Sequence, residues 1–194
     1  MKVLASRVGD LRGEVVADER LHQLSRWGER LSRLGIAPAA SGNLSLRLDG
    51  GFVITRTEVE LASIHPTDWV LVTRLERRPD GTLEVTYLGD HTPSRDSFVH
   101  GTVYAGTPAA HSIFHLHDRG ILEKADRLGI PATDHYYPAG TAGSVAEIER
   151  LLVRHPSADY FVLVEHGVVA WAADIDGAGR LVERWHHRAR EAND

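Results

Sequence analysis

A hairpin signal in the first third of the chain constrains the fold more than any other feature of the sequence. Leu44, Leu46 and Leu48 alternate with polar residues, and the segment 49–51, Asp-Gly-Gly, then leads into the apolar run 52–54. Alternation with a period of two is typical of a half-buried β-strand, and Asp-Gly is a frequent hairpin turn. We therefore expect two antiparallel strands joined by this turn.

Further strands and helices are indicated on both sides of the hairpin. Segments 69–73 and 83–87 are strand-like and are separated by the polar turn 78–81, so the first half predicts a small antiparallel sheet. Apolar residues recur every three or four positions over 15–34, which predicts an amphipathic helix that stops near Gly35. The second half alternates, with helices expected over 96–104, 121–128, 144–154 and 177–191, strands over 111–117 and 160–164, and a short strand near His135.

The third of these helices has a recognisable start. Ser144 is a good N-cap residue, and Glu147 follows three positions later, as in a capping box. No repeat, linker or low-complexity segment divides the chain. We expect one α/β domain over residues 1–194.

The composition restricts the kinds of site that the chain can form. It has 12 histidines and no cysteine, so any metal must be held by histidine and carboxylate groups. The formal net charge is −5 and no basic stripe is present, which argues against a nucleic-acid partner. Asp10, Arg12 and Glu14 interrupt any signal-peptide core, and no apolar run reaches membrane-spanning length. We expect a cytoplasmic protein without a membrane partner.

Three histidines are candidate metal ligands. His115 and His117 are two residues apart on an expected strand, so both imidazoles project from one face, as two ligands of one metal must. Histidines in this pattern can also be hydrogen-bonded surface residues. His166 follows a buried strand and precedes Gly167, which permits a sharp turn of the backbone. Considered alone, it could equally be a turn histidine bonded to a backbone carbonyl.

Asp96 is the candidate carboxylate of this site. It lies at or near the start of an expected helix, where a carboxylate also caps free backbone amides. Three neutral imidazoles leave a dication uncompensated, so Asp96 could serve as a fourth ligand or as a general base. Capping and catalysis are compatible in a loop that precedes a helix. His91, His100, His111 and His135 could orient ligands or substrate, or be ordinary surface and packing histidines.

Several short blocks resemble the class II aldolase/adducin family in order and context. They are Ser-Gly-Asn-Leu-Ser-Leu-Arg from Ser41, Phe-Val-Ile-Thr from Phe52, Pro-Ser-Arg-Asp from Pro93, His-Leu-His from His115 and Glu-His-Gly from Glu165. The resemblance covers roughly residues 15–190. It implies a three-layer α/β/α fold with a largely antiparallel central sheet, a homotetramer and one divalent metal ion per subunit. Zinc is the expected metal, with manganese, cobalt and iron as alternatives.

The resemblance also suggests a proton donor. In members similar to fuculose-phosphate aldolase, a tyrosine from the neighbouring subunit protonates the departing fragment. The segment 130–136 of this chain looks like the one that supplies it, which makes Tyr136 the candidate acid. A tyrosine here could instead be an interface or strand anchor with its ring buried.

The family's phosphate pocket is only partly matched. Candidate substrate-binding residues stand at matching places: Gly42, Asn43, Thr57 and Ser94. Three positions depart from the pattern, because Ala40 replaces a hydroxyl residue, Glu58 a glycine and Arg95 a serine. Glu58 would repel a phosphate unless it turned away, whereas Arg95 could bind a phosphate or a carboxylate in a bidentate manner. Alternatively, Glu58 and Arg95 pair with each other or face solvent.

These observations predict a metal-dependent lyase of the aldolase type. The metal would chelate the carbonyl and adjacent hydroxyl of a ketose-like substrate, with or without a phosphate or carboxylate group. It would lower the energy of the enediolate formed on carbon–carbon cleavage. Asp96 would move the proton, and Tyr136 would serve the other fragment. Asp96 stands where the related aldolases have glutamate and the related epimerases have aspartate. An epimerase, a dehydratase, a decarboxylase or a non-catalytic adducin-like module are the alternatives.

Overall fold

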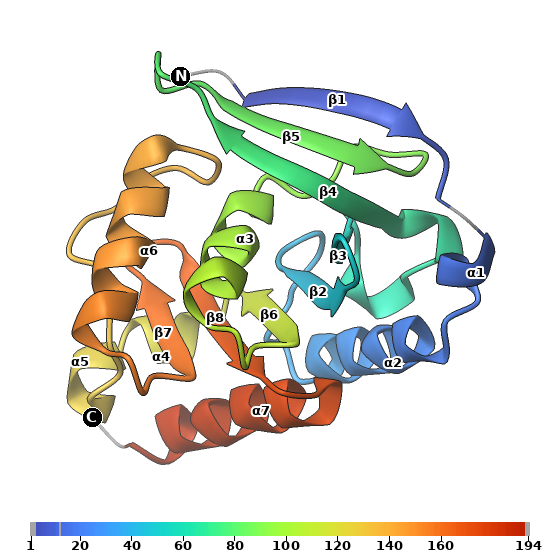
Figure 1. Ribbon diagram of the computed structural model, residues 1–194. Helices are drawn as coiled ribbons and strands as arrows, with labels where there is room; N and C mark the ends of the chain where they lie inside the picture. The colour runs from blue at the N-terminus through green and yellow to red at the C-terminus, as the bar shows by residue number, and fades with distance from the viewer. Residues whose placement is uncertain (1–2, 12, 193–194) are drawn as a thin grey trace.

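An eight-stranded sheet forms the centre of the protein, as a computed structural model that describes residues 3–11 and 13–192 shows (Figure 1). The strands are β1 (Val3–Gly9), β2 (Asn43–Leu48), β3 (Gly51–Thr55), β4 (Trp69–Arg77), β5 (Leu83–Leu88), β6 (Ser112–Leu116), β7 (Tyr160–Leu163) and β8 (Gly167–Ala172). Their order across the sheet is β1-β5-β4-β3-β2-β6-β8-β7. Every neighbouring pair is antiparallel except β1 and β5, so the predicted largely antiparallel sheet is confirmed.

Helices cover both faces of the sheet. They are α1 (Gly13–Val16), α2 (Glu19–Arg33), α3 (Ser97–Gly106), α4 (Arg119–Leu122), α5 (Ala125–Leu128), α6 (Ala142–Arg154) and α7 (Ile175–Glu191), with short 3₁₀ turns η1 (Leu61–Ser63) and η2 (Pro66–Asp68). One hydrophobic core joins α2, α4, α5 and α7 to one face of the sheet, and a second joins α3 and α6 to the other face. The expected three-layer α/β/α architecture is confirmed.

Helix α2 shows why the periodicity of the sequence is informative. Its predicted apolar stripe is buried, with Leu24 and Leu31 fully inaccessible to solvent. The helix starts at Glu19, later than expected, because Asp18 is its N-cap. The side chain of Asp18 accepts a hydrogen bond from the backbone N–H of Arg20. Residues 13–16 before this cap form the separate helix α1.

Three local expectations were wrong, and two strands were missed. No strand forms near His135, because Ala132 makes only an isolated bridge to Val162 and the chain then bends. The helix expected over 121–128 is two short helices, α4 and α5. Helix α6 begins before Ser144, since the side chain of Thr141 accepts the backbone N–H of Ser144 and is the true N-cap. Strands β1 and β8 were not predicted from the sequence, because β1 is a largely exposed edge strand and β8 directly follows a tight turn.

The hairpin matters most for the site. Strand β2 pairs with β3 on one side and with β6 on the other, with Asn43 opposite His115. Strand β6 also pairs with β8, where His115 lies opposite Val169. The start of β2, the end of β6 and the start of β8 therefore lie side by side. We call this border of the sheet, which is formed by strand ends, the sheet edge. Within the described residues, no helix is both long and apolar enough to cross a lipid bilayer.

Candidate metal centre

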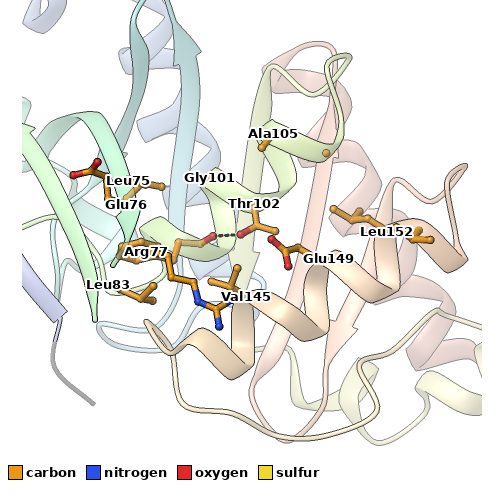
Figure 2. A pocket seen from close by; sticks show the side chains of 13 residues that line it. Leu75, Glu76, Arg77, Leu83, Gly101, Thr102, Ala105, Val145, Glu149 and Leu152 are labelled. Atoms are coloured by element: carbon orange, nitrogen blue, oxygen red, sulfur yellow. Dashed lines mark hydrogen bonds between the residues drawn. The ribbon is translucent and has the colours of Figure 1, made fainter. Parts of the chain in front are cut away.

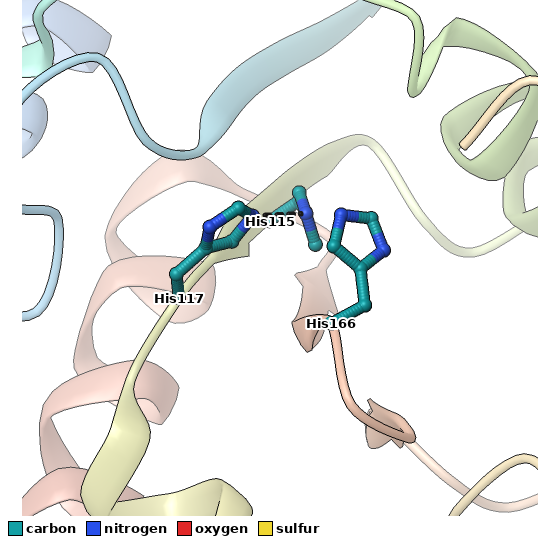
Figure 3. A group of neighbouring side chains, drawn as sticks. All are labelled: His115, His117 and His166. Carbon is teal, nitrogen blue, oxygen red and sulfur yellow. Dashed lines mark hydrogen bonds between the residues drawn. The ribbon is translucent and has the colours of Figure 1, made fainter. Parts of the chain in front are cut away.

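The three candidate ligands converge at this edge of the sheet (Figure 3). His115 lies on β6, His117 follows the end of that strand, and His166 lies in the turn between β7 and β8. One ring nitrogen from each residue lies within 4.8 Å of the other two. The Nε2 atoms of His115 and His117 are 3.1 Å apart. Such a set of nitrogen atoms can share a single cation between them.

The turn that carries His166 has an unusual backbone. Glu165 has a positive φ of 58°, which places it in the left-handed region that favours glycine. The backbone N–H of His166 donates to the carbonyl of Leu163 at 3.0 Å and closes the turn. The sharp turn expected at Gly167 is thus made at Glu165 instead, while Gly167 provides space. A Cβ at Gly167 would stand 2.6 Å from the carbonyl oxygen of Leu116.

His115 is oriented as a metal ligand needs to be. Its ring is completely buried, and its Nδ1–H donates to the carbonyl of Val168 at 3.0 Å, so the lone pair of Nε2 faces the centre of the cluster. Burial lowers the pKa of His115 to about 4, and Asp96 opposes this shift only in part. Burial also lowers the pKa of His117. Both rings are therefore neutral at neutral pH, the state in which imidazole binds metals.

Asp96 lies beside the histidines and does not cap the helix. Its Oδ2 is 3.6 Å from Nε2 of His115 and accepts the side-chain N–H of Asn43 at 2.8 Å. The residue occupies the N-cap position of α3, but its carboxylate bonds none of the described helix amides. Asn43 also donates to Oγ of Ser94 at 3.0 Å, and this oxygen accepts the backbone N–H of Asp96. Asn43 and Ser94 thus fix the carboxylate.

The electrostatics keep Asp96 ionised. Burial alone raises the pKa of this carboxyl, but His115 and His166 together with the N–H of Asn43 more than offset the effect, so the pKa lies below its usual value. Within the described residues, Oδ1 of Asp96 and Oδ1 of Asn43 are buried and have no hydrogen-bond partner. Buried acceptors without partners are rare and costly. Two such atoms beside three imidazoles fit a bound divalent cation and an oxygen-rich substrate.

The remaining substrate-binding candidates line the loops around this edge. Gly42 has a positive φ of 92° and lies so close to β6 that a Cβ would stand 2.6 Å from the carbonyl of His115. The N–H of Thr57 donates to the carbonyl of Thr92 at 3.0 Å. Glu58 and Arg95 both face solvent, and in the part of the chain that is described they form no ion pair with each other. Glu58 also adopts a positive φ of 56°.

The loop with the candidate acid has two exposed tyrosines. Tyr136 is 48% exposed, and no contact within the described chain brings it to the three histidines. Tyr137 packs against Gly143 of α6 and lines a narrow cavity together with His166. Tyr137 was not among the predicted site residues, and its position next to Tyr136 is the one feature of the sequence that points to it.

Glu147 fastens this loop to the body of the protein. It is 2% exposed, accepts the backbone N–H of Asp134 at 2.9 Å and pairs with Arg150. Its place after Ser144 suggested a capping role in the sequence, but the structure gives it a different one. Arg154 adds an ion pair to Asp134 at 3.0 Å.

A separate groove lies away from the histidines, between α3, α6 and β4 (Figure 2). It has a volume of about 520 Å³. Apolar side chains such as Leu75, Phe98 and Leu152 form most of its wall, and none of the candidate site residues contributes to it. A site for charge-stabilising chemistry needs convergent polar groups. The histidine cluster meets this requirement.

The fold and the site together define a class of protein. It has three α/β/α layers and a cluster of three histidines at one sheet edge. The chain belongs to the Class II Aldolase and Adducin N-terminal domain family, whose sequence profile matches residues 22–192. The family resemblance seen in the sequence is thereby confirmed.

Individual relatives are enzymes with different reactions. The chain is 27% identical to a methylthioribulose-1-phosphate dehydratase of Methylococcus capsulatus, covering 86% of this chain and 89% of the relative. It is 24% identical to a 3-oxo-tetronate 4-phosphate decarboxylase of Cupriavidus necator, covering 87% and 81%. A solved L-fuculose 1-phosphate aldolase has the same fold, with a TM-score of 0.73, 18% identity and coverage of 90% and 85%.

Proposed function

We propose that this protein is a metal-dependent lyase that cleaves a ketose-like substrate, phosphorylated or carboxylated, next to its carbonyl group. The observation that carries the proposal is the convergence of three imidazole nitrogens within 4.8 Å beside a buried, ionised Asp96. Family membership supports a small-molecule substrate. We also propose that the protein is cytoplasmic and forms one domain, as the sequence predicts.

His115, His117 and His166 would hold the divalent cation. Zinc suits a site of three imidazoles with room for oxygen ligands, and manganese, cobalt and iron remain alternatives. A bound dication would polarise the carbonyl and the adjacent hydroxyl of the substrate, which favours the enediolate. The hydrogen bond from His115 to Val168 keeps the ligand nitrogen in place.

Asp96 would transfer the proton at the carbon next to the carbonyl. In the cleavage direction, the hydroxyl that becomes the aldehyde gives up its proton, the carbon–carbon bond breaks, and its electron pair moves into the enediolate. The Asp96 carboxylate would then take up a proton from solvent and pass it to that carbon, so that one proton is lost from oxygen and one is gained by carbon. In the addition direction, the carboxylate removes the same proton. Asn43 and Ser94 hold the carboxylate in one orientation, which is required for efficient proton transfer.

Tyr136 would transfer the proton of the hydroxyl group that becomes the aldehyde of the other fragment. Its exposure of 48% supports a role in the site of a neighbouring subunit, so we propose a homo-oligomer, most simply a tetramer. Gly42, Thr57 and Arg95 would bind the substrate through the loops around the sheet edge. Arg95 is the exposed guanidinium in this set and suits an anionic group on the substrate.

Dehydration is the second candidate reaction. The dehydratase from Methylococcus capsulatus, at 27% identity over nearly the whole chain, supports it. Dehydration also starts when a base removes the proton next to a carbonyl, but hydroxide then leaves from the neighbouring carbon and no carbon–carbon bond breaks. The two reactions differ in their products, because cleavage gives two carbonyl fragments and dehydration gives one dehydrated product and water.

The test is metal content followed by product analysis. Wild type, a His115→Ala/His117→Ala variant and a His22→Ala control, which removes an exposed histidine of α2, are purified without chelators and analysed for metal. We expect about one metal per chain in wild type and in the control, and none in the double variant. Ketose 1-phosphates and hydroxy acids are then supplied, and the products are identified by mass spectrometry.

Each outcome separates the candidates. Two fragments that appear only with the metal-loaded protein support an aldolase, and a single product lighter by one water supports a dehydratase. Wild type that cannot be loaded with any divalent metal would overturn the enzyme proposal and favour a non-catalytic adducin-like module. Metal binding without turnover of any carbonyl substrate would also count against a lyase.

A further inference from the structure

A chain of polar side chains crosses the core between the sheet and α3. Ser45 of β2 has its Oγ 2.6 Å from Nδ1 of His100 and 2.7 Å from the hydroxyl of Tyr104. Ser45 and His100 are fully inaccessible to solvent, and Tyr104 is 6% exposed. Ile54 and Ile113 flank Ser45 on the neighbouring strands, and the guanidinium of Arg47 lies over the ring of Tyr104 at 4.6 Å. Polar groups in such a place cost free energy unless they are bonded, so their presence calls for a reason.

Burial also determines the charge of His100. It lowers the pKa of His100 to about 3, with a further lowering by His115 and an opposing effect of Asp96. The ring is neutral at neutral pH. A neutral imidazole carries one proton, either on Nδ1 or on Nε2, and the partner of one nitrogen sets the role of the other.

The hydrogen-bond geometry selects one of the two arrangements. If Nδ1–H donated to Ser45, the Ser45 hydroxyl would need a different acceptor, and the Tyr104 hydroxyl is the other hydrogen-bond partner of Ser45 among the described residues. The Tyr104 hydroxyl would then be left with the carbonyl of His111 at 3.4 Å, which is a poor hydrogen bond. In the other arrangement Tyr104 donates to Ser45 at 2.7 Å, and Ser45 donates to Nδ1 of His100 at 2.6 Å. Both short contacts are then satisfied, and the proton of His100 lies on Nε2.

The far side of His100 leads to the candidate catalytic carboxylate. Asp96 and His100 are four residues apart at the start of α3, where the backbone N–H of His100 donates to the carbonyl of Asp96 at 3.0 Å. Side chains with this spacing lie on the same face of a helix. Nε2 of His100 and Oδ1 of Asp96 are both buried and both without a partner among the described residues. A donor and an acceptor without partners are thus neighbours on one helix face.

We propose that His100 is a positioning residue whose Nε2–H is directed at Oδ1 of Asp96, and that Tyr104 and Ser45 hold it in this tautomer. Asn43 fixes one carboxylate oxygen from β2, and His100 fixes the other from α3 through one water molecule, because the two side chains make no direct hydrogen bond. The carboxylate is then held from both sides. The catalytic consequence rests on the proposed function of Asp96, whereas the tautomer does not.

The direct test is the tautomer of His100. The zinc-loaded protein is labelled with ¹⁵N-histidine, and long-range ¹H–¹⁵N correlation spectra are assigned with the His100→Gln variant. We expect the proton on Nε2 in wild type. We expect a mixture or a switch to Nδ1 in Ser45→Ala and in Tyr104→Phe, because the donor to Nδ1 is lost or turned away. Tyr160→Phe is the matched control, since it removes the hydroxyl of another buried tyrosine, on the opposite face of the sheet.

Kinetics on the same variants test the positioning role. We expect kcat to fall about 10- to 100-fold in His100→Leu, with KM and metal content unchanged, because a misplaced carboxylate loses proton-transfer geometry. His100→Gln keeps an N–H at a similar place and should recover part of the loss. If His100→Leu unfolds, Tyr104→Phe and Ser45→Ala give the same measurement with smaller changes.

The outcomes distinguish this inference from the proposed function. A proton on Nδ1 of His100 in wild type, or a tautomer unaffected by Ser45→Ala, overturns the inference even if the protein is an active lyase. The Nε2–H tautomer and its loss in Ser45→Ala support the inference even if no lyase activity is found. A rise in KM together with a fall in kcat that Gln fails to recover would contradict the positioning role and make His100 a packing residue.

Discussion

Gly167 lies directly against the ring of His115, and a Cβ at position 167 would stand 2.7 Å from Cε1 of that imidazole. The same Cβ would stand 3.0 Å from Cδ2 of His117. Real Cβ atoms do not approach other atoms this closely without a shift, so the glycine leaves room for two of the three candidate ligands. The space beside β6, more than freedom of the backbone, explains a glycine here.

The first prediction concerns this contact. Gly167→Ala should displace the rings of His115 and His117 and weaken metal binding at least 10-fold, as disturbed support of ligands commonly does. Zinc affinity measured by competition with a chromophoric chelator checks this. Gly13→Ala is the control, because no atom of the described residues beyond the adjoining stretch of chain lies within 4 Å of the added carbon. Unchanged affinity in Gly167→Ala would contradict the assignment of the histidines as ligands.

The second prediction separates proton transfer from metal binding. Asp96→Asn keeps the size of the side chain but removes its charge, so we expect the turnover rate to fall about 10²- to 10⁴-fold while the metal remains bound. Product formation and metal content measured on the same preparation check this. Activity within a few-fold of wild type would remove Asp96 from the mechanism.

The third prediction concerns the loop after β3. Asp68 is buried and accepts the backbone N–H of His65 at 2.8 Å and the guanidinium of Arg56 at 2.6 Å. Burial raises the pKa of this carboxyl, and these two partners more than reverse the shift, so its folded-state pKa is lowered. A lowered pKa contributes stability that is fully present above the unfolded value, near pH 4, and is lost as the pH falls through the folded value.

Asp68→Asn should therefore lower the free energy of unfolding by about 1–2 kcal/mol at pH 7, because a hydrogen bond to a charged partner is lost. The difference from wild type should shrink below about pH 4. Urea unfolding of both proteins between pH 7 and pH 3 measures it. Glu60→Gln, an exposed change in the same loop, serves as the control. A difference that stays constant with pH would exclude the ionised carboxylate as its source.

The fourth prediction concerns the loop that carries Tyr136. Glu147→Ala removes the acceptor of the Asp134 amide, so this amide should exchange with solvent at least 10-fold faster. Because Tyr136 would be less well placed, turnover should fall while metal content stays the same. Glu149→Ala changes an exposed residue of the same helix and should do neither. Slow exchange at Asp134 in Glu147→Ala would show that the loop is held by other contacts.

Local patterns predicted the parts of the fold that depend on neighbouring residues. The hairpin of β2 and β3 and the shared face of His115 and His117 follow from a period of two, and both are present. Convergence of His166 with this pair depends on the pairing of β6 with β8. The sequence indicated it only through the family resemblance.

Other features could not be derived because distant segments determine them. Asp96 stands at a position where a helix cap is expected. Its carboxylate instead accepts a hydrogen bond from the side chain of Asn43, which is far away in the sequence. Gly167 was predicted to allow a sharp turn of the backbone, but Glu165, with its positive φ, makes that turn. The absence of a strand near His135 follows from a loop that bonds to α6 through Glu147.

The pairing order of the sheet has a consequence for how the protein is made. A growing chain that has emerged as far as α6 already contains Asn43, Asp96, His115 and His117, yet β6 still lacks its partner β8 and the third histidine is missing. The site can be completed only after translation has passed Ala172. Metal binding by the proposed centre would thus follow translation of β8, and a chain that is interrupted earlier would leave the ribosome without a complete site.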